Sequence, residues 1–209
     1  MKTQQATGFL LLAGAGLFSL TLASGAWATD LNKLVDACTV CHERDGASHD
    51  PNMPIIGGYS EPYIISSLTA YKKKSRTCPE IEYLHGDKKV KLTDMCRIAE
   101  TLSAADIRKL AQYYASKKFR RANQDFDPEL AKQGQLIHER DCEKCHSQAG
   151  SVASDDSGIL AGQWTPYLKH QFLAFYAEKR TLADKMKPKF NKLDKTEMEA
   201  LLNYYASFK

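Results

Sequence analysis

"DACTVCHERDG" (residues 36–46) has a counterpart further along the chain, "RDCEKCHSQAG" (residues 140–150). Each stretch holds two cysteines separated by two residues, with a histidine directly after the second cysteine. The shared residues are Cys38, Cys41 and His42 in the first stretch and Cys142, Cys145 and His146 in the second. The two copies are offset by 104 residues in a chain of 209, which indicates a chain built from two equivalent parts.

The repeat extends well beyond this motif. "IIGGYSEPYIISSLTAYKKKSRT" (55–77) aligns without a gap on "ILAGQWTPYLKHQFLAFYAEKRT" (159–181) at the same offset. "YYAS" at 113–116 returns at 204–207, an offset of 91, so the first half carries 13 extra residues, which we place after Thr77. An ungapped match of this length predicts two copies of one domain. The identical pairs include Ile55/Ile159, Gly58/Gly162, Pro62/Pro166, Tyr63/Tyr167, Arg76/Arg180 and Thr77/Thr181.

Helix signals predominate in both halves, and no stretch shows the alternation typical of a strand. The expected helix starts are Asp30, Ser103 with Asp106, Asp127-Pro128, Thr165-Pro166, and Asp194 with Glu197. The first of these helices would turn Leu31, Leu34, Val35 and Cys38 inward. We therefore expect an all-α fold, with domains at 29–120 and 125–209 joined by "FRRANQDFDPEL" (119–130). Short helices bury little apolar area, so a large apolar group should fill each centre.

Residues 1–28 have the features of a secretory signal peptide: Lys2, an apolar run, and Ala26-Trp27-Ala28 as cleavage site. An uncleaved membrane anchor is the alternative. Cleavage would lower the formal net charge from +4 to +3, because the segment contains one lysine and no acidic residue. This charge is too small to favour a nucleic-acid partner. The mature chain is expected to be exported and soluble.

The C-x-x-C-H pattern is typical of covalent haem attachment. Each cysteine sulfur adds to one haem vinyl group, and the histidine that follows reaches the iron. A zinc site would need four ligands, and neither half offers an obvious fourth one. A thioredoxin-like redox pair would need a βαβ setting, which the sequence does not predict. We expect two covalently bound haem c groups.

The other axial ligand of each iron can be sought in the repeat. At the later offset of 91, Met186 falls on Met95, and both precede the final helix of their half. Met198 falls on Ile107, an apolar helix position, and is expected in the core. We expect His42/Met95 and His146/Met186 to be the axial pairs, with His85 as an alternative to Met95. Histidine and methionine together saturate the iron and raise its potential, which suits an electron carrier.

The two remaining cysteines flank the extra residues of the first half. A disulfide between Cys78 and Cys96 would close the insertion (78–96) at its base and would fix the position of the neighbouring Met95. A reactive or metal-binding thiol pair is the alternative.

Several other side chains have an expected place. His49, His138 and His170 have no histidine twin and are expected on the surface or on helix faces. Trp164 is expected in the core or at a haem propionate through its N–H. Six lysines are expected either on a solvated surface or in a positive collar that steers an acidic partner: Lys72, Lys73, Lys74, Lys185, Lys187 and Lys189.

Half two resembles the cytochrome subunit of flavocytochrome c sulfide dehydrogenase in "HERDCEKCH", "ILAGQWTPYL" and "DKMKPKF". Both halves are similar to the wider dihaem class I cytochromes c, over essentially the whole mature chain. The resemblance implies tandem periplasmic domains related by a pseudo-twofold axis and the same thioether and axial residues. It also implies an FAD-bearing flavoprotein subunit that oxidises sulfide and passes electrons to this chain. The insertion and its cysteines depart from that pattern.

Three functions follow from this sequence. The first is an electron-transfer subunit that is fed by the flavoprotein and delivers electrons to a downstream cytochrome or oxidase. The second is a free-standing dihaem shuttle to a terminal oxidase. The third is a dihaem enzyme, such as a peroxidase or thiosulfate dehydrogenase, which needs an open or unusually ligated iron. The repeated methionine argues against the third, and no catalytic acid, base or nucleophile is evident in the sequence.

Overall fold

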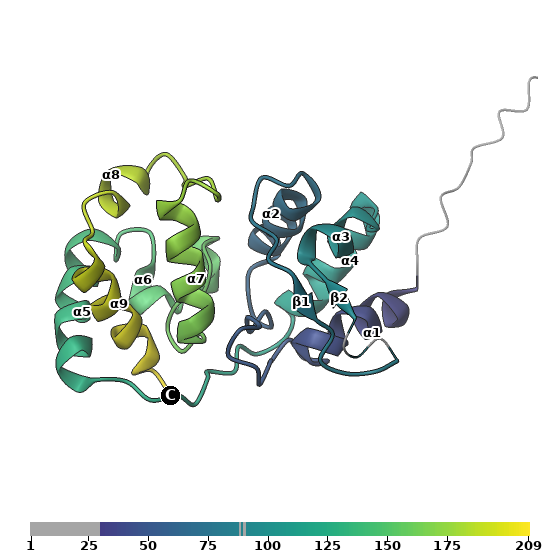
Figure 1. Cartoon of the computed structure of the whole chain (residues 1–209), viewed down its shortest axis with the longest axis horizontal. Coiled ribbons are helices and arrows are strands. Elements are labelled where there is room, and N and C mark those ends of the chain that lie inside the picture. Colours follow the sequence, from purple (N-terminus) through teal and green to yellow (C-terminus); the bar gives the residue numbers. More distant parts are fainter. Residues whose placement is uncertain (1–29, 88, 90) are drawn as a thin grey trace, which may run out of the picture.

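The computed structural model describes residues 30–87, 89 and 91–209, so the expected signal peptide lies outside the described residues. The fold is all-α, as predicted (Figure 1). No helix in the described ranges has the length and apolar character needed to cross a bilayer. The first half contains α1 (Leu31–His42), α2 (Glu61–Lys72), β1 (Ile81–Glu82), β2 (Leu92–Thr93), α3 (Met95–Glu100) and α4 (Ala104–Ala115). The second half contains α5 (Pro128–Asp141), α6 (Ser147–Gly150), the 3-10 turn η1 (Ala153–Asp155), α7 (Thr165–Tyr176), α8 (Lys187–Phe190) and α9 (Lys195–Ala206).

Each half has its own hydrophobic core. In the first domain, α4 packs on α1 and α2, and Leu110 and Tyr114 are buried there. In the second domain, α9 packs on α5 and α7 around Leu201 and other apolar residues. Helices α5 and α9 are in close contact at Gly134, where an added Cβ atom would lie 2.1 Å from the Ala200 carbonyl oxygen. Two tandem domains of similar helical plan lie side by side (Figure 1).

Most of the predicted helix starts are confirmed. Asp30 and Asp127 cap α1 and α5, and complete capping boxes open α4 and α9. Helix α7 differs from the prediction, because it begins at Thr165, follows Trp164 and has no side-chain cap. The Thr165 amide instead donates to Oε1 of Gln124 in the linker, 2.9 Å away. A residue distant in the sequence therefore accepts the hydrogen bond that a capping side chain would accept. Leu31 is exposed rather than inward-facing.

The insertion contains two short strands, β1 and β2, which are the strands found among the described residues. Strands β1 and β2 pair antiparallel, with Ile81 opposite Thr93 and Glu82 opposite Leu92. Each strand is two residues long, which is too short for apolar and polar residues to alternate detectably. No strand could therefore be predicted in this segment.

Candidate functional site

The first C-x-x-C-H motif lies at the C-terminal end of α1. Cys38 and Cys41 are three residues apart on this helix, so their sulfurs share one face, and His42 is its last residue. Nδ1 of the buried His42 lies 3.0 Å from the Pro54 carbonyl oxygen. Burial lowers the pKa of His42, although the contact with Pro54 opposes this shift. A neutral ring that donates from Nδ1 leaves the Nε2 lone pair for a metal ion.

A largely apolar cavity brings together the residues expected around the first haem. Cys38, His42 and Met95 all line it, although Met95 is more than fifty residues from the motif. His85 is not among its lining residues and lies instead 3.7 Å from Glu43, at 65% side-chain exposure. Among the described residues, Met95 is thus better placed than His85 to face His42. The other lining residues are Pro54, Ile56, Tyr59, Tyr63, Ile64, Ser67, Leu68, Tyr71, Arg76, Leu110, Tyr114 and Tyr167.

The second motif lies where α5 ends and α6 begins. Cys142 caps the C-terminus of α5, Cys145 follows in the connecting turn, and His146 directly precedes α6. Cys142 and Met186 are both partly buried and pack against the core of the second domain. Nδ1 of His146 is buried and has no hydrogen-bond partner among the described residues. The second domain therefore presents two cysteines, a histidine and a methionine, the same residue types as the first domain.

A buried guanidinium group also lines the first cavity. Arg76 is 5% exposed, and its Nε has no hydrogen-bond partner among the described residues. Its Nη2 donates to the Tyr167 hydroxyl at 2.8 Å and to Oε1 of Gln171 at 2.9 Å, both in the second domain, and its Nη1 donates to the Ser67 hydroxyl at 3.3 Å. No ion pair with a carboxylate occurs for it within the described ranges. A buried positive charge with a free donor fits a bound anion, such as a haem propionate.

The chain can be compared with known proteins on this geometry. No family model matches it. It is 30% identical over 207 residues to cytochrome c4 from Stutzerimonas stutzeri, which covers 93% of this chain and 94% of that protein. The chain belongs to the cytochrome c4 family.

Two solved structures are similar to this chain in fold. The crystal structure of reduced recombinant cytochrome c4 from Pseudomonas stutzeri superposes with a TM-score of 0.67 at 26% identity, covering 87% of this chain and all of that one. Thiosulfate dehydrogenase (TsdBA) from Marichromatium purpuratum superposes with a TM-score of 0.65 over 36% of its own chain, and at 24% identity this likeness concerns the fold alone. This member of the cytochrome c4 family is a dihaem electron-transfer protein with two covalently bound haem c groups.

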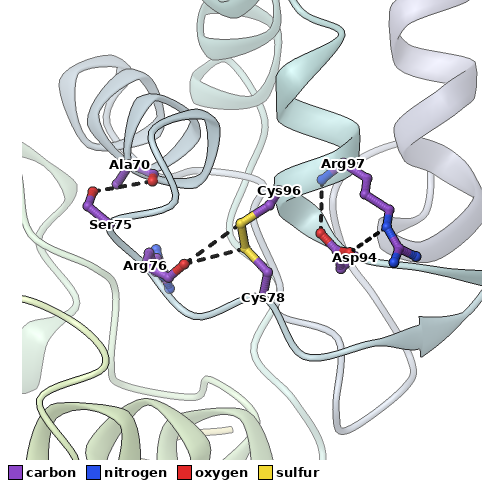
Figure 2. Close-up of a disulfide and its surroundings, with 7 residues drawn as sticks. All are labelled: Ala70, Ser75, Arg76, Cys78, Asp94, Cys96 and Arg97. Carbon is purple, nitrogen blue, oxygen red and sulfur yellow. Dashed lines mark hydrogen bonds and ion pairs between the residues drawn. A yellow bond between two sulfur atoms is a disulfide. The ribbon is translucent and has the colours of Figure 1, made fainter.

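The insertion of this cytochrome is closed by a disulfide between Cys78 and Cys96, whose Cα atoms are 5.7 Å apart. Figure 2 shows the Arg76 carbonyl oxygen beside both sulfurs, 3.4 Å from Cys78 Sγ and 3.8 Å from Cys96 Sγ. Asp94 caps α3 by accepting from the Arg97 amide at 2.9 Å. Met95 lies between Asp94 and Cys96, so the cap and the disulfide hold it from both sides.

The interface between the two domains of this cytochrome is built from buried polar side chains. Gln163 is fully buried and bonds to both backbone groups of Ile55, accepting from the amide at 3.0 Å and donating to the carbonyl at 2.8 Å. It also donates to the Tyr59 hydroxyl at 2.8 Å. Nε1 of Trp164 donates to the Ser48 carbonyl at 2.9 Å. The expectation of a propionate partner for Trp164 is therefore replaced by this contact between the domains.

His138 lies on a face of α5, as one of the two expected placements, but this face is the buried one. His138 is fully buried in the second domain, with Nδ1 2.9 Å from the Tyr205 hydroxyl and Nε2 2.8 Å from the Glu143 carboxylate. Its Nε2 also lies 3.0 Å from the His146 carbonyl oxygen, which ties it to the second motif. The repeat contained a signal for this position, because His138 falls on Leu34, a core residue, at the offset of 104. His49 and His170 are exposed, as expected.

The positive collar expected from the six lysines is weaker than the sequence alone suggests, because several of them interact within the chain. Lys187 pairs with Asp184 at 2.8 Å, and Lys189 pairs with Asp141 at 3.2 Å. Nζ of Lys72 donates to the carbonyl oxygens of Glu100 and Leu102. Half of the six lysines therefore have a partner within the chain, and two of these partners are carboxylates that offset the positive charge.

Proposed function

We propose that this cytochrome is a periplasmic electron carrier in which each iron is closed on both faces. Cys38 and Cys41 hold the first haem, and Cys142 and Cys145 hold the second. His42 with Met95, and His146 with Met186, are the axial ligands. The two domains extend over 29–120 and 125–209, after removal of residues 1–28. The observation that carries the proposal is that Met95 lines the same cavity as Cys38 and His42.

Haem c supplies one-electron chemistry, and the side chains of this protein determine which other reactions can occur. A thioether on the sixth position leaves no site for a small substrate on the iron, and histidine with methionine favours a high potential. The aliphatic and aromatic side chains that line the first cavity make it a poor environment for water. Arg76 is placed to balance the charge of a propionate there. These features favour electron transfer over catalysis at the iron.

The test is a haem assay with absorption spectroscopy of the purified mature protein. We expect two covalently bound haems per chain, a methionine-to-iron charge-transfer band in the oxidised state, and no spectral change on adding cyanide or carbon monoxide at rest. Fewer than two haems, or an iron that readily takes up an added ligand, would contradict the proposal.

The donor that we propose is an FAD-containing flavoprotein subunit that oxidises sulfide, with a downstream cytochrome or oxidase as acceptor. This proposal is based on the resemblance in "HERDCEKCH", "ILAGQWTPYL" and "DKMKPKF". A pull-down from native periplasm followed by a flavin assay tests it, and copurifying FAD with sulfide-dependent haem reduction is the expected result.

A free-standing shuttle between redox partners is the second candidate. Its support is the match to cytochrome c4, which covers 93% of this chain and 94% of that relative. Recovery of the cytochrome without flavin, in a form that still reduces a terminal oxidase, would favour the shuttle over the flavoprotein complex.

A further inference from the structure

The two C-x-x-C-H motifs differ in how much of each is accessible to solvent. Cys41 is 7% exposed, whereas its twin Cys145 is exposed. His42 is buried, and its twin His146 is half-buried. The two halves are copies of one domain, so something specific to the first half must cover its motif.

The disulfide-closed insertion is that cover. The Leu84 backbone lies close enough to the Cys41 sulfur to oppose the rise in the pKa of this thiol that burial causes. Beside it, Nε2 of His85 lies 3.7 Å from a carboxylate oxygen of Glu43, directly after the motif. Both residues belong to the loop between β1 and β2, which lies beside α1 (Figure 1). The second half lacks these 13 residues, so Cys145 has no equivalent cover.

The base of the insertion is fixed independently of this contact. The Cys78–Cys96 disulfide joins its two ends, and the β1–β2 pairing continues with the Tyr83 amide donating to the Lys91 carbonyl at 3.1 Å. A loop held at its base and by its strands loses little further entropy when it contacts α1. The cover is therefore part of the folded domain.

We propose that the insertion insulates the thioether edge of the first haem, so that external partners exchange electrons at the Cys145 edge of the second domain. This inference rests on the proposed function, because it needs haems bonded at both motifs. A cysteine sulfur bonded to the haem marks one edge of the macrocycle, so its burial reports the burial of that edge. Electron tunnelling slows steeply with distance through protein. The first haem would then exchange with the outside mainly through the second.

The surface beside Cys145 indicates what kind of partner can dock there. Lys144 and Asp156 are exposed and opposite in sign, while Asp155 is engaged with the Ser147 amide at 2.7 Å. Ser157 Oγ donates to the Cys145 carbonyl at 3.3 Å, which places Asp156 near this edge. Two carboxylates, Asp155 and Asp156, thus lie beside one lysine, so this edge carries a net negative charge and fits a redox protein with basic residues around its own cofactor edge.

Two measurements on the full-length mature holoprotein test the proposal. The first is stopped-flow reduction by ascorbate and by hexaammineruthenium(II), small probes of opposite charge, with haem methyl NMR signals identifying each haem. We expect two phases with both probes, the slower one belonging to the first haem. The second is amide hydrogen exchange at Leu84, where we expect protection by the contact with Cys41.

Variants then link the slow phase to the insertion. Deletion of residues 79–91 should abolish the slow phase, and Leu84→Pro, which removes the amide donor, should accelerate it. Leu92→Ser, at an exposed position of the same hairpin, is the matched control and should leave both phases unchanged. Equal reduction rates for the two haems of the unaltered protein, or unprotected exchange at Leu84, would overturn the inference even if no variant folds.

These outcomes separate this inference from the proposed function. A protein with fewer than two haems, or without the methionine band, contradicts the proposed function. Two intact six-coordinate haems that react at equal rates leave the proposed function standing and contradict only the insulating role of the insertion.

Discussion

Arg76 of the first domain donates a hydrogen bond to the Tyr167 hydroxyl of the second domain, across 2.8 Å. The repeat gives this contact a counterpart, because Arg180 and Tyr63 are the twins of these residues and the positive charge of Arg180 acts to lower the pKa of Tyr63. Both arginines donate to the same oxygen, Oε1 of Gln171, at 2.9 Å and 2.7 Å. Contacts exchanged in both directions are what a pseudo-twofold arrangement of two copies produces.

The two tyrosines of this pair have different ionisation behaviour. Burial raises the pKa of Tyr167 to about 12, although Arg76 opposes the shift. Burial also acts to raise the pKa of Tyr63, but the positive charges of Arg76 and Arg180 outweigh it and lower that pKa. The Tyr167 phenol therefore stays protonated near neutral pH, so it can accept from Arg76 and still offer its own proton to an anion.

The first prediction concerns this interface. Tyr167→Phe should lower the free energy of unfolding by about 1 kcal/mol, because Arg76 loses a buried hydrogen bond while the ring remains. Calorimetry should also show the two domains melting less cooperatively. Tyr113→Phe is the control, since the Tyr113 hydroxyl donates to Arg44 within the first domain. Equal effects on domain coupling from both variants would contradict a special role for the Arg76 contact.

The second prediction concerns the sixth ligand of the first iron. Met95→Ala should abolish the methionine-to-iron band of one haem only, because Met186 still serves the other, and both haems should stay covalently attached. The midpoint potential of the affected haem should fall, since the thioether stabilises the reduced iron. Absorption spectra and a redox titration measure both effects. An unchanged spectrum would show that another residue, such as His85, holds that position.

The third prediction concerns the disulfide. Replacing Cys78 and Cys96 together by alanine opens a loop with a sequence separation of 18. We expect the free energy of unfolding to fall by roughly 3 kcal/mol in the chain-entropy model. Because Met95 precedes Cys96, the methionine band of the first haem should weaken while that of the second does not. Denaturant unfolding and absorption spectra provide the two readouts, and a stability equal to the unaltered protein would refute the expectation.

The fourth prediction is a pH dependence at Asp141, beside the second motif. Burial tends to raise the pKa of this carboxyl group, but hydrogen bonds from Arg140 and Lys189 outweigh it and lower the pKa below 3.8. A depressed carboxyl pKa adds stability above its unfolded value, and this contribution disappears as the pH falls through the folded value.

Asp141→Asn should therefore destabilise the protein at pH 7 by roughly 1 to 2 kcal/mol, and the difference should vanish as the pH falls through the lowered pKa of Asp141. Urea unfolding across this range measures it. Asp184→Asn is the matched control, because Asp184 pairs with Lys187 at 95% side-chain exposure and exposed pairs contribute little. A constant difference between Asp141→Asn and the unaltered protein at all pH values would contradict the assignment.

The sequence by itself determined the features that are local or duplicated. Capping residues and helical spacing act within one turn, so the starts of α1, α4, α5 and α9 could be read directly. The C-x-x-C-H pattern carries its chemistry in five residues, and duplication supplied the pairing of Met95 with Met186. Two features were missed: the strands are only two residues long, and the helix that begins at Thr165 is capped by Gln124, 41 residues away.

Only the tertiary structure decided how the two copies differ and how they meet. The contacts of Trp164 with Ser48 and of Arg76 with Tyr167 join residues 116 and 91 positions apart, and no periodic pattern encodes such pairs. The burial of His138 and the cover over Cys41 likewise depend on which segments pack together. Local sequence fixes backbone conformation over a few residues, whereas burial and long-range hydrogen bonds arise only when distant segments exclude water together.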